Sequence, residues 1–86
     1  MKFEFDSNKS QKNKDKQGID FIEAQKLWDV PERIEIPAKC TDELRFLLIA
    51  LINDVCWSAI YTIRDSNIRI ISVRKSRDYE KKIYFS

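Results

Sequence analysis

The chain has 86 residues, of which 43% are hydrophobic and 35% charged, and its formal net charge is +2. This length fits one small domain with its own core, expected over residues 1–86, and the hydrophobic fraction excludes a disordered chain. The absence of histidine and the single glycine exclude His-based triads, the usual zinc sites and glycine-rich phosphate loops.

Apolar segments and cysteines bear on location and cofactors. No run of 18 apolar residues is free of charge, and the start MKFEFD lacks the apolar segment of a signal peptide. We therefore expect a cytoplasmic protein with no membrane partner. Cys40 and Cys56 have neither CxxC spacing nor a histidine to join them, so we expect reduced cysteines, no metal site and no cofactor.

A short strand followed by a polar helix is predicted at the start of the chain. Lys2–Asp6 has Phe3 and Phe5 on one side, which predicts a short strand at a sheet edge. Asp6 is a candidate N-cap for a helix over Ser7–Gln17, which Gly18 can end with positive φ. The lysines of this helix favour a solvated face over phosphate contact.

A second helix is predicted over Asp20–Trp28. Asp20 and Glu23 have the spacing of a capping box, and Pro31 ends the helix. Its apolar residues recur at helical spacing and are expected to lie across an apolar sheet face; they are Phe21, Ala24, Leu27 and Trp28.

Two strands are predicted in the middle of the chain. Arg33–Ile36 is expected as a short edge strand stopped by Pro37 and followed by a loop over Ala38–Glu43. Leu44–Ile52 is a long apolar strand that ends at the two-residue turn Asn53-Asp54.

The segment Trp57–Lys75 predicts a hairpin that turns at Asp65-Ser66. Regular pairing places Thr62 between Arg45 and Arg69, so that two guanidinium groups lie in one row across three strands, with Arg64 diagonal to them. The same register sets Ile60 opposite Ile71, Ser58 opposite Val73 and Trp57 opposite Arg74.

The expected sheet has two different faces. The first is apolar and needs a covering layer; it comprises Leu44, Phe46, Leu48, Tyr61, Ile63, Ile68 and Ile70. The second is basic at one end and apolar at the other, through Leu47, Ile49, Ile60, Ile71 and Val73.

A last helix is predicted after Lys75, with Ser76 as its cap and Asp78 and Glu80 in its first turn, where negative charge is favourable. Tyr79, Ile83 and Phe85 are its expected anchors. The whole pattern indicates an α+β domain, an antiparallel sheet with N-terminal helices and a C-terminal helix packed on it.

The charge distribution points to an anionic partner. Residues 1–43 carry eight Lys/Arg and ten Asp/Glu, whereas residues 44–86 carry eight and four. Arginines on a sheet can bind RNA and stabilise the charge that grows on a pentavalent phosphate. Trp57 and Tyr61 can stack on bases, although Trp57 also suits a core position under Arg74.

Two segments resemble a known family. FEFDSNKSQKNKDKQGIDFIEA is similar to F-x-[WF]-D-x-x-K-x-x-x-N-x-x-K-H-G-[IV]-x-F-E-E-A, and IYTIRDSNIRIISVRKSRDYEKKIY resembles V-Y-T-x-R-x-x-x-I-R-I-I-S-A-R-x-A-x-x-x-E-x-x-x-Y. Both patterns belong to the BrnT toxins of type II toxin–antitoxin systems. The resemblance covers nearly the whole chain.

This resemblance implies a RelE-like fold and an endoribonuclease, here expected to be metal-independent, that inhibits translation. It also implies neutralisation by a BrnA-type antitoxin in a heterotetramer, which binds operator DNA only through the antitoxin. The family's arginines fall on Arg45, Arg64, Arg69 and Arg74, and its last-helix residues on Glu80 and Tyr84.

From these positions we expect two groups of site residues. Arg45, Arg69 and Arg74 are expected to bind phosphate and stabilise the transition state, with Glu80 as a weaker candidate for the base. The expected RNA-binding residues are Arg64, Lys75, Trp57 and Tyr61.

One departure from the family keeps other functions open. Gln17 stands where the family has histidine, in Lys16-Gln17-Gly18, and an amide takes up no proton at neutral pH. The alternative is therefore a weakened or inactive relative that binds antitoxin or RNA without cleavage. A plain RNA-binding module is a third possibility, which the basic half of the chain suits.

Overall fold

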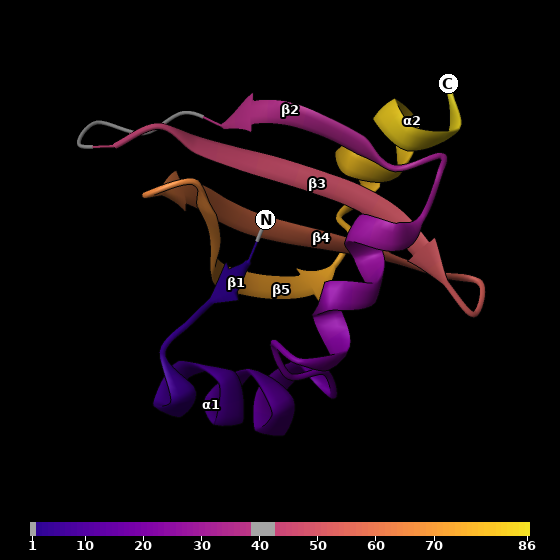
Figure 1. Ribbon diagram of the computed structural model, residues 1–86. Helices are drawn as coiled ribbons and strands as arrows, with labels where there is room; N and C mark the ends of the chain where they lie inside the picture. Colours follow the sequence, from indigo (N-terminus) through magenta and orange to yellow (C-terminus); the bar gives the residue numbers. More distant parts are fainter. Residues whose placement is uncertain (1, 39–42) are drawn as a thin grey trace.

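The computed structural model describes residues 2–38 and 43–86, which form an α+β domain, as predicted (Figure 1). Cys40 lies outside the described residues, whereas Cys56 is buried and free. No helix within the described ranges is long and apolar enough to cross a membrane. In chain order the elements are β1 (Phe3–Glu4), α1 (Ser7–Gln17), η1 (Glu23–Asp29), β2 (Ile34–Ala38), β3 (Arg45–Ile52), β4 (Val55–Arg64), β5 (Asn67–Lys75) and α2 (Asp78–Phe85).

The five strands form one sheet in the order β1-β5-β4-β3-β2. β1 pairs with β5 in parallel and all other neighbours are antiparallel, which confirms the predicted edge strand near the N-terminus. β2 forms the other edge and continues through Pro37, which faces Phe46. A proline is tolerated in an edge strand because the side that lacks the N–H can face away from the neighbouring strand.

Local signals at the ends of α1 work as predicted. The Asp6 side chain accepts hydrogen bonds from the backbone N–H groups of Asn8 and Lys9, at 2.8 and 3.1 Å. At the other end, Gly18 has φ +82° and donates its N–H to the carbonyl oxygen of Lys14. These contacts hold a helix whose sequence is polar on every side.

The capping box before η1 is also present. The Glu23 side chain accepts the Asp20 N–H at 3.1 Å, and the Asp20 side chain accepts the Glu23 N–H at 2.7 Å. The segment forms a 3₁₀ helix over Glu23–Asp29 and not the expected α-helix. Its buried residues nevertheless reach the first sheet face, as predicted.

The first sheet face carries the larger core, covered by η1 and flanked by α1 (Figure 1). Phe21, Ala24 and Leu27 are almost fully buried against it. Two expected members of this core are exposed: Leu44 precedes the start of β3 and is 65% exposed, and Ile63 near the end of β4 is 44% exposed. Both lie near the end of the sheet where the covering layer stops.

Both predicted two-residue turns are present, with positive φ at Asn53 and Asp54 and at Asp65 and Ser66. The β3–β4 register is the predicted one. These paired positive φ values match the twist of the flanking strands.

The β4–β5 register holds only from the turn to Tyr61, which faces Ile70 as predicted. Beyond that pair the register shifts by one residue, so that Ile60 faces Ser72. Ile71 is thus the extra residue of a β-bulge. The predicted pairing of Ile60 with Ile71 is wrong because regular alternation assumes equal numbers of residues on both strands.

The bulge exchanges the faces of the residues that follow it. Val73 was expected on the second face but is buried in the first-face core. Arg74 faces Ser58, and Trp57 faces Lys75, so the predicted pairings of Trp57 with Arg74 and of Ser58 with Val73 are wrong. The bulge therefore delivers the Arg74 guanidinium to the second face.

α2 covers part of the second face, on the other side of the sheet from η1 (Figure 1). Glu80 is fully buried, and Tyr84 packs on the smaller core formed around Leu47, Ile49 and Cys56. The predicted anchors of this helix are wrong: the exposed fractions of Tyr79, Ile83 and Phe85 are 54%, 37% and 63%. The Glu80 carboxylate of this helix points towards the sheet, where it pairs with the Arg74 guanidinium.

Candidate functional site

The second sheet face carries a row of polar side chains that crosses four strands. Arg45 faces Thr62, Thr62 faces Arg69, and Arg69 faces Glu4 of β1. The predicted alignment of two arginines is confirmed, with Arg64 two residues beyond Thr62 on the same face. We call Arg45, Arg64 and Arg69 the arginine surface.

The arginine surface is held loosely by two carboxylates. Glu43 lies 3.3 Å from Nε of Arg45 and 3.6 Å from a terminal nitrogen of Arg64, and Glu4 lies 3.7 Å from Arg69. The arginine side chains are 32% to 52% exposed, so water screens these pairs. Among the described residues, these three guanidinium groups contact two carboxylates, and their side chains stay partly exposed to an anion in solution.

Arg74 lies on the same face nearer to α2, where Glu80 holds it firmly. Two guanidinium nitrogens of Arg74 contact the two Glu80 oxygens at 2.5 and 2.8 Å. Glu80 also accepts the Ser58 hydroxyl at 3.0 Å and the Arg77 backbone N–H at 2.8 Å, and Ser58 is hydrogen-bonded to Ser76 at 2.7 Å. The prediction that Ser76 caps α2 is wrong: Ser76 bonds Ser58 of the sheet, and the N-cap is Arg77, whose backbone N–H Glu80 accepts.

These contacts set the protonation of Glu80. Burial opposes the charged form, but the hydrogen bonds from Arg74, from the Arg77 backbone and from Ser58 outweigh it and lower the pKa of Glu80 to about 2. A carboxylate with this pKa is a weak base, and its oxygens are already engaged. The geometry suits Glu80 for positioning Arg74.

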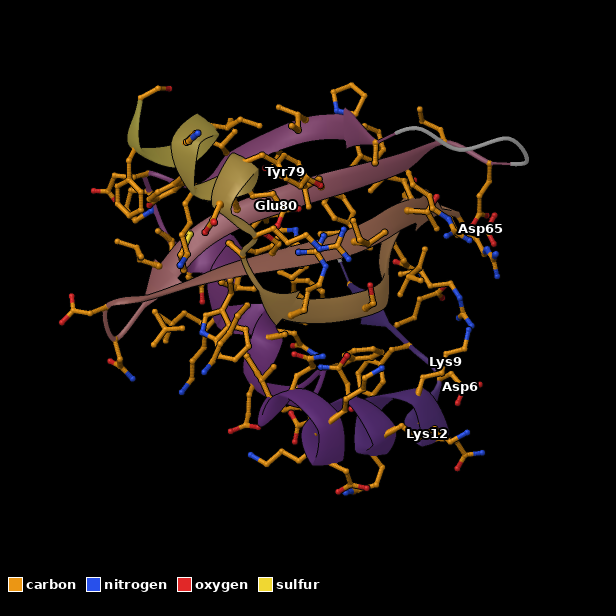
Figure 2. The ribbon with its side chains drawn as sticks, turned by 180° about the vertical axis from the view of Figure 1, so that it is seen from behind. Asp6, Lys9, Lys12, Asp65, Tyr79 and Glu80 are labelled. Carbon is orange, nitrogen blue, oxygen red and sulfur yellow. The ribbon has the colours of Figure 1, made fainter. Side chains whose placement is uncertain are left out.

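Tyr79, beside Glu80, is an exposed aromatic residue that the sequence interpretation assigned to packing. Figure 2 shows both labelled residues in α2 above the second sheet face, with Asp65 at the far end of the sheet. Tyr79 fits no position of the family pattern quoted above. Its exposure follows from the burial of Glu80, because adjacent residues of a helix point in different directions.

The other predicted RNA-binding residues lie apart from the arginine surface. Trp57 and Tyr61 belong to the first-face core and are 9% and 5% exposed. The Tyr61 hydroxyl donates to Glu35, and burial, with this bond, raises the pKa of Tyr61. Lys75 is exposed at the end of β5. The structure brings Arg45, Arg64, Arg69 and Arg74 onto one face.

Gln17 is half-buried at the C-terminal end of α1. This helix contacts the first-face core: Ser10 accepts the Phe21 N–H at 2.9 Å, and Asn13 bridges the carbonyl oxygen of Ile19 and the N–H of Val73. The helix that carries the position of the family histidine is thus hydrogen-bonded to the backbone of β5 and to the segment that precedes η1.

Within residues 2–38 and 43–86, no three His, Cys, Asp or Glu side chains gather in a way that holds a metal ion.

A comparison with protein families gives one match over most of the chain. The family model is described as "Ribonuclease toxin, BrnT, of type II toxin-antitoxin system", and it matches residues 5–80. No curated protein matches the chain.

Proposed function

Because the chain belongs to the BrnT family of ribonuclease toxins of type II toxin–antitoxin systems, we propose that it is an endoribonuclease that cleaves RNA on the arginine surface and thereby inhibits translation. In this proposal guanidinium groups, and not a metal ion, stabilise the reacting phosphate. A RelE-like relationship and a cytoplasmic site of action belong to the same proposal.

The row formed by Arg45, Thr62 and Arg69 carries the proposal. It places two guanidinium groups on one sheet face, where only loose ion pairs compete with a phosphate. In the proposed step a 2′-hydroxyl gives its proton to water and attacks the adjacent phosphorus, the P–O5′ bond breaks, and the 5′-oxygen leaves with a proton from water. Negative charge grows meanwhile on the non-bridging oxygens, and two planar guanidinium groups can bind them. Arg64 and Arg74 extend the positive surface to neighbouring phosphates, and Lys75 adds charge at the end of β5.

The test compares arginines on the two faces of the sheet. We expect Arg69→Ala and Arg45→Ala each to slow cleavage of a long RNA by roughly 10²- to 10³-fold, as for other groups that stabilise transition-state charge. Arg33→Ala is the matched control, since Arg33 pairs with Glu35 at 3.2 Å and lies away from this surface. Equal rates for all four proteins would overturn the site, and loss of activity with EDTA would overturn metal independence.

The family also supports an antitoxin partner. We propose that a BrnA-type antitoxin neutralises the chain in a heterotetramer, and that the complex binds operator DNA through the antitoxin. Expression of the chain alone is then expected to arrest growth, and co-expression of the antitoxin or the Arg69→Ala change to relieve the arrest. Light scattering of the purified complex tests the stoichiometry.

Gln17 favours a second candidate, an attenuated relative that binds RNA or antitoxin without cleavage. Gln17 is half-buried and its helix is hydrogen-bonded to β5, which argues for a packing role of the family histidine, so we expect wild type and Gln17→His to degrade RNA alike. Degradation by the Gln17→His form alone would establish the attenuated relative instead.

A further inference from the structure

Tyr79 is exposed without an evident packing role. Its exposed fraction is 54%, whereas Tyr84, on the same helix, is half-buried against the second-face core and makes an edge contact with Phe85 at 5.1 Å between ring centroids. Exposing an aromatic ring to water forgoes a large burial energy. A ligand that covers the ring recovers this energy.

Tyr79 lies next to a residue that fixes α2 to the sheet. Its neighbour Glu80 joins α2 to β4 through Ser58, to β5 through Arg74 and to the helix N-terminus through the Arg77 N–H. The backbone at Tyr79 is therefore held relative to the sheet, so little backbone freedom is lost when the ring binds a ligand.

The guanidinium group of Arg74 lies near Tyr79. Arg74 contacts Glu80, the residue that follows Tyr79 in α2, at 2.5 and 2.8 Å. After Glu80, the Tyr79 phenol is among the groups that raise the pKa of Arg74. Arg74 lies on the same sheet face as Arg69, farther along β5. Figure 2 shows Tyr79 beside Glu80 in α2, which lies over this face. The surface thus offers an aromatic plane and a line of positive charges.

We propose that Tyr79 is a stacking platform for an unpaired base of the RNA, with the flanking phosphates on Arg74 and the arginine surface. This inference rests on the proposed function and narrows its substrate to single-stranded RNA. In a duplex each base is already stacked and paired, so it can reach the ring only after unpairing. Stacking tolerates any base, which predicts weak sequence preference at this position.

The test measures binding separately from cleavage. The probe is a fluorescein-labelled, single-stranded 2′-O-methyl oligonucleotide, which lacks the attacking hydroxyl, and affinity is read by anisotropy at low salt. We expect Tyr79→Ala to weaken binding by roughly 5- to 150-fold. Tyr79→Phe and Tyr79→Trp, which keep an aromatic plane, are expected to bind like wild type. Phe85→Ala is the control, since Phe85 is the other exposed aromatic residue among the described residues.

A second readout uses the same variants on cleavable RNA. A lost stacking contact is expected to raise KM for a single strand with little change in kcat, and to leave the weak reaction with a fully paired duplex unchanged. Wild-type affinity in Tyr79→Ala, an equal loss in Phe85→Ala, or no binding of the probe by wild type would overturn the platform. If wild type binds but cleaves no RNA, the proposed function fails while the platform stands.

Discussion

Glu80 shows how one buried carboxylate can join a helix to two strands of the sheet. It is fully buried, yet four donors, two of them on Arg74, satisfy its oxygens. Desolvation of a charge this deep is costly and is repaid only when every partner is in place. The residue therefore links the position of α2, and with it Tyr79, to the position of Arg74.

The lowered pKa of Glu80 makes stability depend on pH. In the unfolded chain this carboxyl titrates near its usual 4.5, whereas in the folded chain it stays ionised down to about 2. The stabilisation is thus fully present above pH 4.5 and is lost as the pH falls from 4.5 towards 2. We expect the free energy of unfolding to drop by about 3 kcal/mol over this range, measured by urea titration at each pH.

Replacement of Glu80 tests the same network at neutral pH. Glu80→Gln leaves Arg74 without its charge partner and is expected to cost about 3–5 kcal/mol of unfolding free energy. Glu23→Gln is the control: its carboxylate contacts Lys14 at 2.7 Å, but both side chains are more than 40% exposed, and glutamine keeps the capping contact. A similar loss in both variants would contradict the special role of the buried pair.

At the scale of elements, α1 depends on its ends. Gly18 has φ +82°, and a Cβ at this position would meet nothing within 4 Å, so any cost of a larger residue comes from the backbone alone. We expect Gly18→Ala to lower the unfolding free energy by about 1–2 kcal/mol and Gly18→Asn by less. Lys12→Ala, on the exposed face of the same helix, should change it by less than about 0.5 kcal/mol; thermal melts can separate these outcomes.

Element ends were predictable because their signals are local. Asp6, Gly18 and the Asp20–Glu23 box each act on backbone groups within a few residues, so the sequence alone identifies them. The two-residue turns fix the strand register in the same way, which is why the row formed by Arg45 and Arg69 could be predicted before the structure.

The predictions that were wrong concern features that depend on interactions between distant segments. No glycine or other local signal marks the bulge at Ile71, whose position depends on how β5 fits against β4. The buried face of α2 was misjudged because burial of Glu80 is favourable only with Arg74 opposite it. Tyr79 was therefore predicted as an anchor. The bulge separates Trp57 from Arg74, which regular pairing had placed opposite each other.

The whole molecule presents its charges unevenly, and this predicts the salt dependence of RNA binding. Each phosphate neutralised on a single strand releases counterions and contributes about −0.7 to the slope of log affinity against log salt concentration. We expect Arg69→Ala to make this slope less steep by about 0.7, and Arg33→Ala to leave it unchanged. An anisotropy titration at several salt concentrations measures both; equal slopes for all three proteins would place the RNA elsewhere.

The bulge in β5 has a further consequence for how the gene can change. Because the strand carries one spare residue between Ile70 and Arg74, loss of one codon from Ile71 to Val73 can be absorbed by restoring regular pairing, with Arg74 still opposite Ser58. An added codon cannot be absorbed in this way, because one more residue must either enlarge the bulge or turn Arg74 into the first-face core. Length variation among descendants of this chain is therefore expected to be one-sided at this point, towards the shorter hairpin.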